Sequence, residues 1–296
     1  MNKLKFSQKH PFLFGLFLIF TVVVLIIVAM AVFTFWIGSD GLSFGRQKLG
    51  VVTVKGTISK SNRINAWIEK LARDDDIHGV IVRVNSPGGG VAPSQEIYAA
   101  IARLAKKKPV VVSMGSVAAS GGYYIACAAD KIVANPGTIT GSIGVKAQLV
   151  NLKKLMQKLG IQDETLTSGP YKDTGSPSHP LSPKEKAYMQ NLIDDLYEQF
   201  VQDVAKGRHL EIKHVRKLAD GRAYTGRQAK EYGLVDQLGG MNQAVELVRS
   251  LAGLKGPITL VKGPEEKFSL LSFLLGLKNK LVLERDVLGP QWVFEY

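Results

Sequence analysis

A long apolar segment near the start of the chain limits its architecture more than any other feature. Residues 11–39 contain no Lys, Arg, Asp, Glu or His. A helix needs about 20 apolar residues to cross a bilayer core, so this segment is long enough to span one. A cleaved signal peptide has an apolar stretch of about 7–15 residues before a small-residue cleavage site, whereas bulky Phe35 and Trp36 stand in that region here. The sequence therefore predicts an uncleaved membrane anchor over residues 11–38.

The charges that flank the anchor predict its orientation. Lys3, Lys5 and Lys9 precede it, whereas Asp40 follows it before the first basic residue, Arg46. Positively charged flanks stay on the cytoplasmic side of a membrane. We therefore expect a cytoplasmic N-terminus at residues 1–10 and a single pass through the membrane. The rest of the chain would lie on the extracytoplasmic side, after a short polar spacer over residues 39–48.

Composition narrows the classes of partner and cofactor. The chain has 296 residues and a formal net charge of +13. With the predicted topology, this excess of positive charge fits a domain beside anionic membrane lipid better than a nucleic-acid partner. Cys127 is the only cysteine, so an intramolecular disulfide is impossible and a thiolate metal site is not expected. We expect no metal and no cofactor.

After the spacer, short β-branched runs alternate with helical patterns. The predicted strands cover residues 51–55, 80–85, 110–113 and 132–134, and the predicted helices cover 63–73, 94–107 and 120–129. This alternation is typical of right-handed βαβ units and predicts an α/β fold with a parallel sheet. A longer helix is predicted over residues 183–206. A helix-rich remainder follows, with short strands at 234–235 and 258–261.

A run of three glycines follows one of the predicted strands. Gly88 to Gly90 come after the strand that ends at Asn85, and α/β proteins bind ligands beyond the carboxyl ends of their strands. Glycine N–H groups are unobstructed by side chains, as an oxyanion hole or an anion-binding loop requires. A glycine-rich turn without a ligand is the alternative. The phosphate-binding pattern G-x-x-x-x-G-K-[ST] does not occur here, so nucleotide binding is poorly supported.

Ser120 stands between a predicted strand and a predicted helix, among small residues. It is either a simple helix N-cap or a nucleophile whose oxyanion is bound by the N–H of Gly121. A serine nucleophile needs an adjacent base. Among the histidines, His179 is the candidate, but it would also need an orienting acid. Lys172 is the rival, since burial lowers the pKa of a lysine from about 10.4 towards neutrality.

Four segments together resemble signal peptide peptidase A in its short bacterial form, a family of Ser–Lys serine peptidases in the Clp protease/crotonase superfamily. They read NSPGGG, SMGSVAASGGYYIACAADKIVANPGTITGSIGV, TSGPYKDTGSPSHPLSPKEKAYMQ and DGRAYTGRQAKEYGLVDQLGG. The resemblance implies a Clp/crotonase-like core of repeated β-β-α and βαβ units over residues 49–262, with a helix-rich C-terminal part. We expect the apolar C-terminal segment, residues 263–296, to lie at an interface.

The resemblance also implies roles for individual residues. Ser120 matches the nucleophile, Lys172 the general base and Ser142 the serine that orients the lysine. The N–H groups of three glycines match the oxyanion hole of the family: Gly88, Gly89 and Gly121.

The function implied is that of an endopeptidase anchored in the bacterial inner membrane that degrades remnant signal peptides. Family members form homo-oligomeric rings in which neighbouring subunits complete each site. A crotonase-like acyl-CoA enzyme and a non-catalytic membrane scaffold are the alternatives.

Overall fold

The computed structural model of this chain describes residues 10–38, 47–264 and 294–296. The chain divides into two units, one ending at Arg46 and one from Gln47 to Tyr296. The first contains the helix α2 (Pro11–Gly38), which is apolar on all sides. Its residues 11–33 are long and apolar enough to cross a membrane. Most of the predicted spacer and of the predicted interfacial C-terminal segment lies outside the described residues.

The second unit is built on an eight-stranded sheet with the order β7-β5-β3-β2-β1-β9, in which β4 pairs with β3 and β8. Each pairing within this sheet is parallel except β5 with β7. The predicted α/β class with a parallel sheet is confirmed. The strands are β1 (Gln47–Lys55), β2 (Ile77–Ser86), β3 (Val110–Ala119), β4 (Lys131–Ala134), β5 (Ile139–Gly141), β7 (Ala223–Thr225), β8 (Gln237–Leu238) and β9 (Ile258–Gly263).

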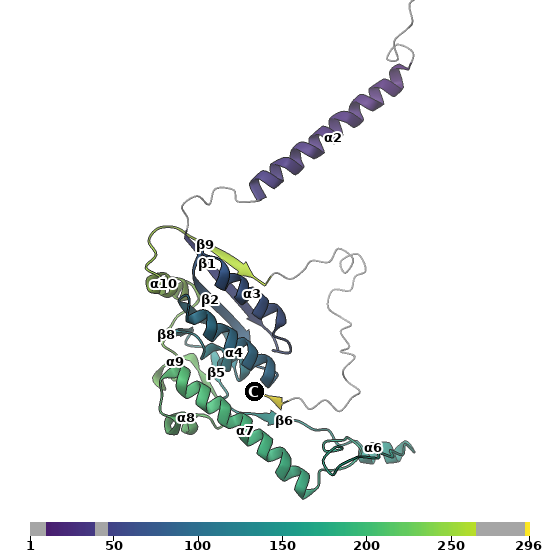
Figure 1. The fold of residues 1–296 in the computed structure, drawn as a ribbon, viewed down its shortest axis with the longest axis vertical. Coiled ribbons are helices and arrows are strands. Elements are labelled where there is room, and N and C mark those ends of the chain that lie inside the picture. Colours follow the sequence, from purple (N-terminus) through teal and green to yellow (C-terminus); the bar gives the residue numbers. More distant parts are fainter. Residues whose placement is uncertain (1–9, 39–46, 265–293) are drawn as a thin grey trace, which may run out of the picture. The chain divides into compact units, whose positions relative to one another are not determined.

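Helices cover both faces of this sheet (Figure 1). Val52, Val82 and Val112 point to a large core shared with four helices, α3 (Asn62–Arg73), α4 (Val91–Ala105), α5 (Gly121–Ala126) and α7 (Pro183–Arg208). Their neighbours Leu49, Ile81 and Val111 point to the other face, beneath α10 (Met241–Leu251). Because successive strand residues face opposite sides, central strands with helices on both faces are apolar throughout. This explains the continuous β-branched runs of the sequence.

Three short helices complete the second unit: α6 (Lys153–Lys158), α8 (Ile212–Leu218) and α9 (Gly226–Glu231). Residues 148–180, which we call the arm, contain α6 and Lys172, and α6 lies away from the sheet beside the start of α7 (Figure 1). By contrast, α7 packs tightly against the end of α5, which Cys127 caps. A Cβ atom at Gly207 would lie only 2.0 Å from the backbone oxygen of Cys127. Cys127 is buried, and burial raises the pKa of its thiol to about 12.

The two largest differences from the predicted elements have identifiable reasons. The strand predicted over residues 110–113 continues to Ala119, because Val117, Ala118 and Ala119 pair with β5. The strand predicted at residues 234–235 is a turn instead. The N–H groups of Leu234 and Val235 both donate to the backbone oxygen of Ala229, so these buried residues need no neighbouring strand. The strand lies just beyond them, as β8.

Candidate active site

Ser120 occupies a sharp turn between the sheet and a helix. Strand β3 ends at Ala119 and α5 begins at Gly121. Ser120 has φ 54° and ψ −123°, a conformation that costs a residue other than glycine about 1–3 kcal/mol. Its N–H donates to the backbone oxygen of Gly141 at 2.8 Å, which ties the turn to β5. A strained strand-to-helix turn of this kind holds the nucleophilic serine of many hydrolases at the top of a sheet.

The hydroxyl of Ser120 does not cap the helix that follows. Ser120 occupies the N-cap position of α5, but its side chain makes no capping hydrogen bond. The residue is 92% buried, with a relative exposure of 8%. Its own backbone oxygen accepts from the N–H groups of Tyr123 and Tyr124, so the first turn of α5 is closed without the side chain. The structure therefore does not support the alternative in which Ser120 serves only as a helix N-cap.

The glycine run lies directly against this turn. A Cβ atom at Gly88 would lie 2.8 Å from the nitrogen of Gly121 and 2.9 Å from Cβ of Ser120. A Cβ atom at Gly89 would lie 2.4 Å from the backbone oxygen of Ile58. Both glycines also have φ values that disfavour side chains, 110° and 152°. Glycine is thus required here by close approach of the backbone and by its conformation.

One of the three N–H groups expected in an oxyanion hole is already engaged. The N–H of Gly88 donates to Oγ of Ser86 at 3.1 Å, and Ser86 is fully buried. An oxyanion would have to compete with this bond. Sequence reasoning missed Ser86, although a serine directly before Pro87 and the glycine run was a visible signal. The N–H groups of Gly89 and Gly121 are the remaining pair.

A cavity of about 560 Å³ opens at Ser120. Ser142 lines the same cavity, has φ 50°, and is held by a 2.9 Å hydrogen bond from its N–H to the backbone oxygen of Arg222. The predicted site residues on this wall are Gly88, Gly89, Ser120 and Ser142. Gly121 adjoins them through the contacts with Gly88. The fold thus brings five of the six predicted residues together.

An extended segment of the chain itself occupies one side of this cavity. Strand β10 (Phe294–Glu295) pairs antiparallel with β6 (Lys146–Ala147), and Glu295 forms an antiparallel bridge with Gly90 on its other side. The N–H of Tyr296 donates to the backbone oxygen of Gly89 at 3.1 Å. Two backbone edges, β6 and the glycine run, therefore border the cavity and can hold an extended chain between them.

The side chain of Tyr296 fills an aromatic pocket beside the glycine run. Its ring lies 4.7 Å from the rings of Tyr124 and Phe200, measured between centroids. Its hydroxyl accepts a 3.0 Å hydrogen bond from Nε2 of Gln95. Sequence reasoning missed this pocket, because its members come from segments far apart in the chain.

Lys172 is not brought to this cavity by the described part of the chain. It lies in a turn of the arm, where its N–H donates to the backbone oxygen of Gly169 at 3.2 Å, and it is exposed. It is absent from the described residues that line the cavity at Ser120. A single copy of the chain therefore presents the serine site and the predicted base in two separate places.

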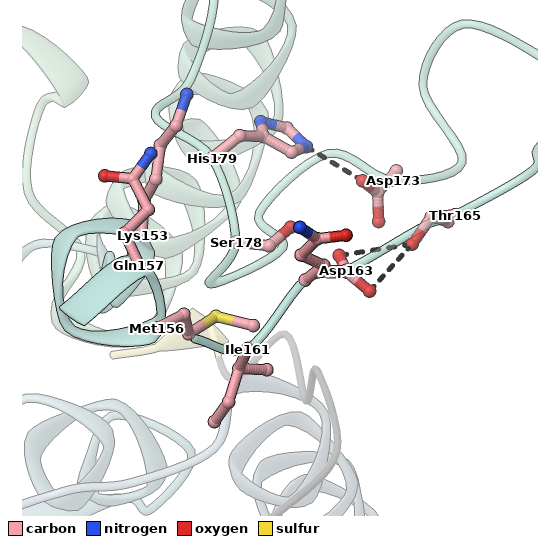
Figure 2. Close-up of a pocket in the computed structure, with 10 residues that line it drawn as sticks. Lys153, Met156, Gln157, Ile161, Asp163, Thr165, Asp173, Ser178 and His179 are labelled. Atoms are coloured by element: carbon pink, nitrogen blue, oxygen red, sulfur yellow. Dashed lines mark hydrogen bonds and ion pairs between the residues drawn. The ribbon is translucent and has the colours of Figure 1, made fainter. Parts of the chain in front are cut away.

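His179 has an acid partner but does not serve Ser120. Its Nε2 lies 2.8 Å from Oδ2 of Asp173 (Figure 2), and its Nδ1 lies 3.1 Å from the backbone oxygen of Pro180. Both ring nitrogens are thus engaged. The ring lines a second cavity, of about 550 Å³, within the arm. Within the described ranges, no group of three or more His, Cys, Asp or Glu side chains could hold a metal ion.

Comparison with known proteins identifies the family of this chain. The model of peptidase family S49 matches residues 102–255. A candidate protease from Synechocystis sp. is 42% identical over 246 residues, which cover 82% of this chain and 88% of that protein. The chain belongs to peptidase family S49, and it is a serine peptidase.

Two further relatives carry more specific names. A candidate signal peptide peptidase SppA from Enterococcus faecium is 43% identical over 217 residues, covering 69% of this chain and 63% of that protein. The chloroplastic serine protease SPPA of Arabidopsis thaliana is 32% identical over 266 residues, covering 84% of this chain and 39% of that protein. These names favour a peptidase over the acyl-CoA enzyme and the non-catalytic scaffold.

Proposed function

We propose that this chain is a membrane-anchored endopeptidase that uses Ser120 as nucleophile and Lys172 as general base. The observation that carries the proposal is the buried, strained turn of Ser120, whose hydroxyl is not used for capping and which faces a cavity. The glycines beside it supply N–H groups at the position where a tetrahedral intermediate develops charge. We assign the peptidase domain to residues 49–262.

The proposed reaction has two halves. Neutral Nζ of Lys172 accepts the proton of Ser120 Oγ, which attacks the scissile carbonyl carbon, and the N–H groups of Gly89 and Gly121 stabilise the oxyanion. The protonated lysine then donates to the leaving amine, so the peptide bond breaks and an acyl-enzyme remains. In the second half, the lysine accepts a proton from water, which attacks the ester carbonyl carbon. The ester bond then breaks, and the lysine returns the proton to Oγ of Ser120, which regenerates both groups. Ser142 is proposed to orient the lysine.

The exposed position of Lys172 leads us to propose a shared active site. A lysine acts as a base only in its neutral form, which dry surroundings favour. The arm that carries it presents large apolar side chains to solvent, with Leu159 65% exposed and Leu166 93% exposed. Apolar patches of this kind are typical of protein interfaces. We therefore propose a homo-oligomeric ring in which the arm of one subunit packs against its neighbour and delivers Lys172 to the neighbour's Ser120.

The proposed substrates are remnant signal peptides. An extended apolar substrate is supported by the chain's own segment from Phe294 to Tyr296, which lies extended beside the glycine run with an aromatic ring packed against Tyr124. A relative carries the name signal peptide peptidase. The helix α2 would keep the enzyme in the bacterial inner membrane, with the N-terminus inside and the catalytic domain on the extracytoplasmic side. Apolar peptides left in that membrane would then lie within reach.

Mixing two inactive variants tests the dyad and the shared site together. Purified Ser120→Ala and Lys172→Ala proteins should each be inactive on a peptide ester. After dissociation and reassembly at equal amounts, the mixture should regain about a quarter of the wild-type activity, the chance that a random pair of neighbours supplies both intact residues. A mixture of Ser120→Ala with the double variant is the matched control and should stay inactive. Full activity of Lys172→Ala alone would overturn the proposed base.

A further inference from the structure

The imidazole of His179 is held between two oxygen acceptors. Oδ2 of Asp173 faces one ring nitrogen at 2.8 Å (Figure 2), and the backbone oxygen of Pro180 faces the other at 3.1 Å. A backbone carbonyl cannot donate a hydrogen bond, and neither can an ionised carboxylate. Both ring nitrogens must therefore carry a proton for both hydrogen bonds to form. The arrangement requires the imidazolium cation.

The other charged groups near His179 favour the same state. Glu185, in the first turn of α7, interacts electrostatically with the ring. Asp163 and Lys153 line the same cavity as His179 and Asp173. Two carboxylates, Asp173 and Glu185, therefore act on the ring, whereas Asp163 and Lys153 share only its cavity. The hydrogen bonds to Pro180 and Asp173 raise the pKa of His179 above its ordinary value of 6.5.

This cation connects the turn of Lys172 to the start of α7. Asp173 directly follows Lys172, and the backbone oxygen of Asp173 accepts from the N–H of Ser176. At the other end, Ser182 and Glu185 form a capping box that fixes the first turn of α7. His179 lies between these two points in the chain, and its hydrogen bond to Asp173 joins the segment just before α7 to the turn of Lys172. This pair is a contact through which the position of that turn can be fixed.

We propose that His179 is a positioning residue, which in its cationic form fixes the turn that carries Lys172 and thereby supports catalysis. This inference rests on the proposed role of Lys172. Because the folded pKa of His179 is raised, the clamp is complete below pH 6.5 and is lost as pH rises through the raised value. A general base becomes active as pH rises, so the two effects oppose each other.

Two substitutions separate charge from side-chain size. Arginine also donates from two nitrogens but keeps its charge at every accessible pH. His179→Arg should therefore have the kcat of the wild type at pH 6. As pH rises, its kcat should not show the loss that deprotonation of His179 causes in the wild type. The side chain of glutamine is uncharged, so it cannot replace the two hydrogen bonds that the imidazolium cation donates. His179→Gln should lower kcat about tenfold to a hundredfold at pH 6, the effect of a misplaced catalytic group, with KM little changed.

The matched control is His78→Gln, at an exposed histidine on β2 outside the arm. It should leave kcat and its pH profile unchanged. These measurements use the full chain in detergent and a peptide-ester substrate. Wild-type kcat in His179→Gln across the whole pH range would overturn the positioning role.

A readout independent of activity distinguishes failure of this inference from failure of the dyad. Amide hydrogen exchange at Thr174 and Ser176, whose N–H groups are hydrogen-bonded within the turn, should be slower in the wild type at pH 6 than in His179→Gln at the same pH. His179→Arg should keep these amides protected at pH 8, where the wild type begins to lose protection beyond the intrinsic change with pH. Unchanged exchange in His179→Gln would overturn the clamp itself, whatever the activity of Lys172→Ala. If Lys172→Ala were fully active while His179→Gln lost amide protection as expected, the dyad would be rejected instead.

Discussion

The surroundings of Ser120 and of Lys172 differ in almost every physical respect. Ser120 lies at the end of β3, in the middle of the sheet, and is buried against glycines that no other residue could replace without a clash. Lys172 lies in an exposed turn of the arm, held mainly by local hydrogen bonds. One copy of the chain thus forms the nucleophile's surroundings completely. The surroundings proposed for the base require a second copy.

The difference follows from where each segment obtains its stability. The strained backbone of Ser120 is maintained by the rigid sheet beneath it, where Val110, Val111 and Val112 are fully buried. The arm buries few of its apolar side chains, and its short helix α6 contains no buried residue. Few buried contacts permit local opening at low free-energy cost. A subunit interface would supply the burial that the arm lacks.

The largest predicted effect tests the Ser120 side of this comparison. Ser120→Ala and Ser120→Gly should each lose kcat by a factor on the order of 10⁶. Glycine adopts the φ of 54° freely, but it also adds freedom to the unfolded chain, which offsets part of the gain. Ser120→Gly should therefore be more stable than Ser120→Ala by about 1 kcal/mol, measured by urea unfolding. Equal stability of the two variants would show that the turn stores no strain.

A pair of glycine substitutions compares the two regions directly. Gly89→Ala places a methyl group 2.4 Å from the backbone oxygen of Ile58, which cannot move without disturbing the sheet edge. We expect a loss of about 3 kcal/mol in unfolding free energy. Gly160, in the arm, also has a positive φ, 70°, but nothing lies within 4 Å of a Cβ there. Gly160→Ala should cost only about 1 kcal/mol. Similar losses in both variants would contradict the claim that the arm is loosely packed.

The smallest predicted effect concerns the capping box where the arm meets α7. The N–H of Ser182 donates to Oε2 of Glu185 at 2.8 Å, and the hydrogen bonds from Ser182 lower the pKa of Glu185 below its ordinary value of 4.5. A carboxyl with a lowered folded pKa stabilises the protein above pH 4.5, and this contribution disappears as pH falls through the folded value. Glu185→Gln should therefore cost about 1 kcal/mol or less at pH 7. The difference from wild type should vanish once pH falls below the lowered pKa of Glu185, as followed by urea unfolding. A difference independent of pH would assign the effect to packing.

The sheet and the serine turn could be predicted because their signals are local. Buried parallel strands have uninterrupted β-branched sequences, and the small residues around Ser120 permit a tight turn that glycines can approach. The end of β3 was harder to predict, since residues 115–119 resemble a turn in sequence. Their strand conformation depends on β5, which pairs with Val117 to Ala119 from a separate part of the chain.

Other parts of the site could not be predicted because they depend on long-range contacts. No local pattern indicates that Tyr296 lies beside Gly89, or that its ring stacks on Tyr124. The N–H of Gly88 was expected to be available, but only the folded structure shows that Oγ of Ser86 accepts from it. The distance between Lys172 and the serine cavity is likewise a property of the tertiary fold. The resemblance implies that neighbouring subunits complete each site, but no local pattern in the sequence indicates it.

The buried position of Cys127 has a practical consequence for studying the arm. Cys127 is the only cysteine in the sequence, and it lies beneath α7 with a thiol pKa raised to about 12 by burial. Thiolates, not thiols, react with alkylating labels, so Cys127 should not react with such reagents. A cysteine introduced at exposed Leu166 or Val150 would then carry a single fluorophore or spin label without first removing the native one. The movement of the arm between free and assembled subunits could be followed on an otherwise unlabelled molecule.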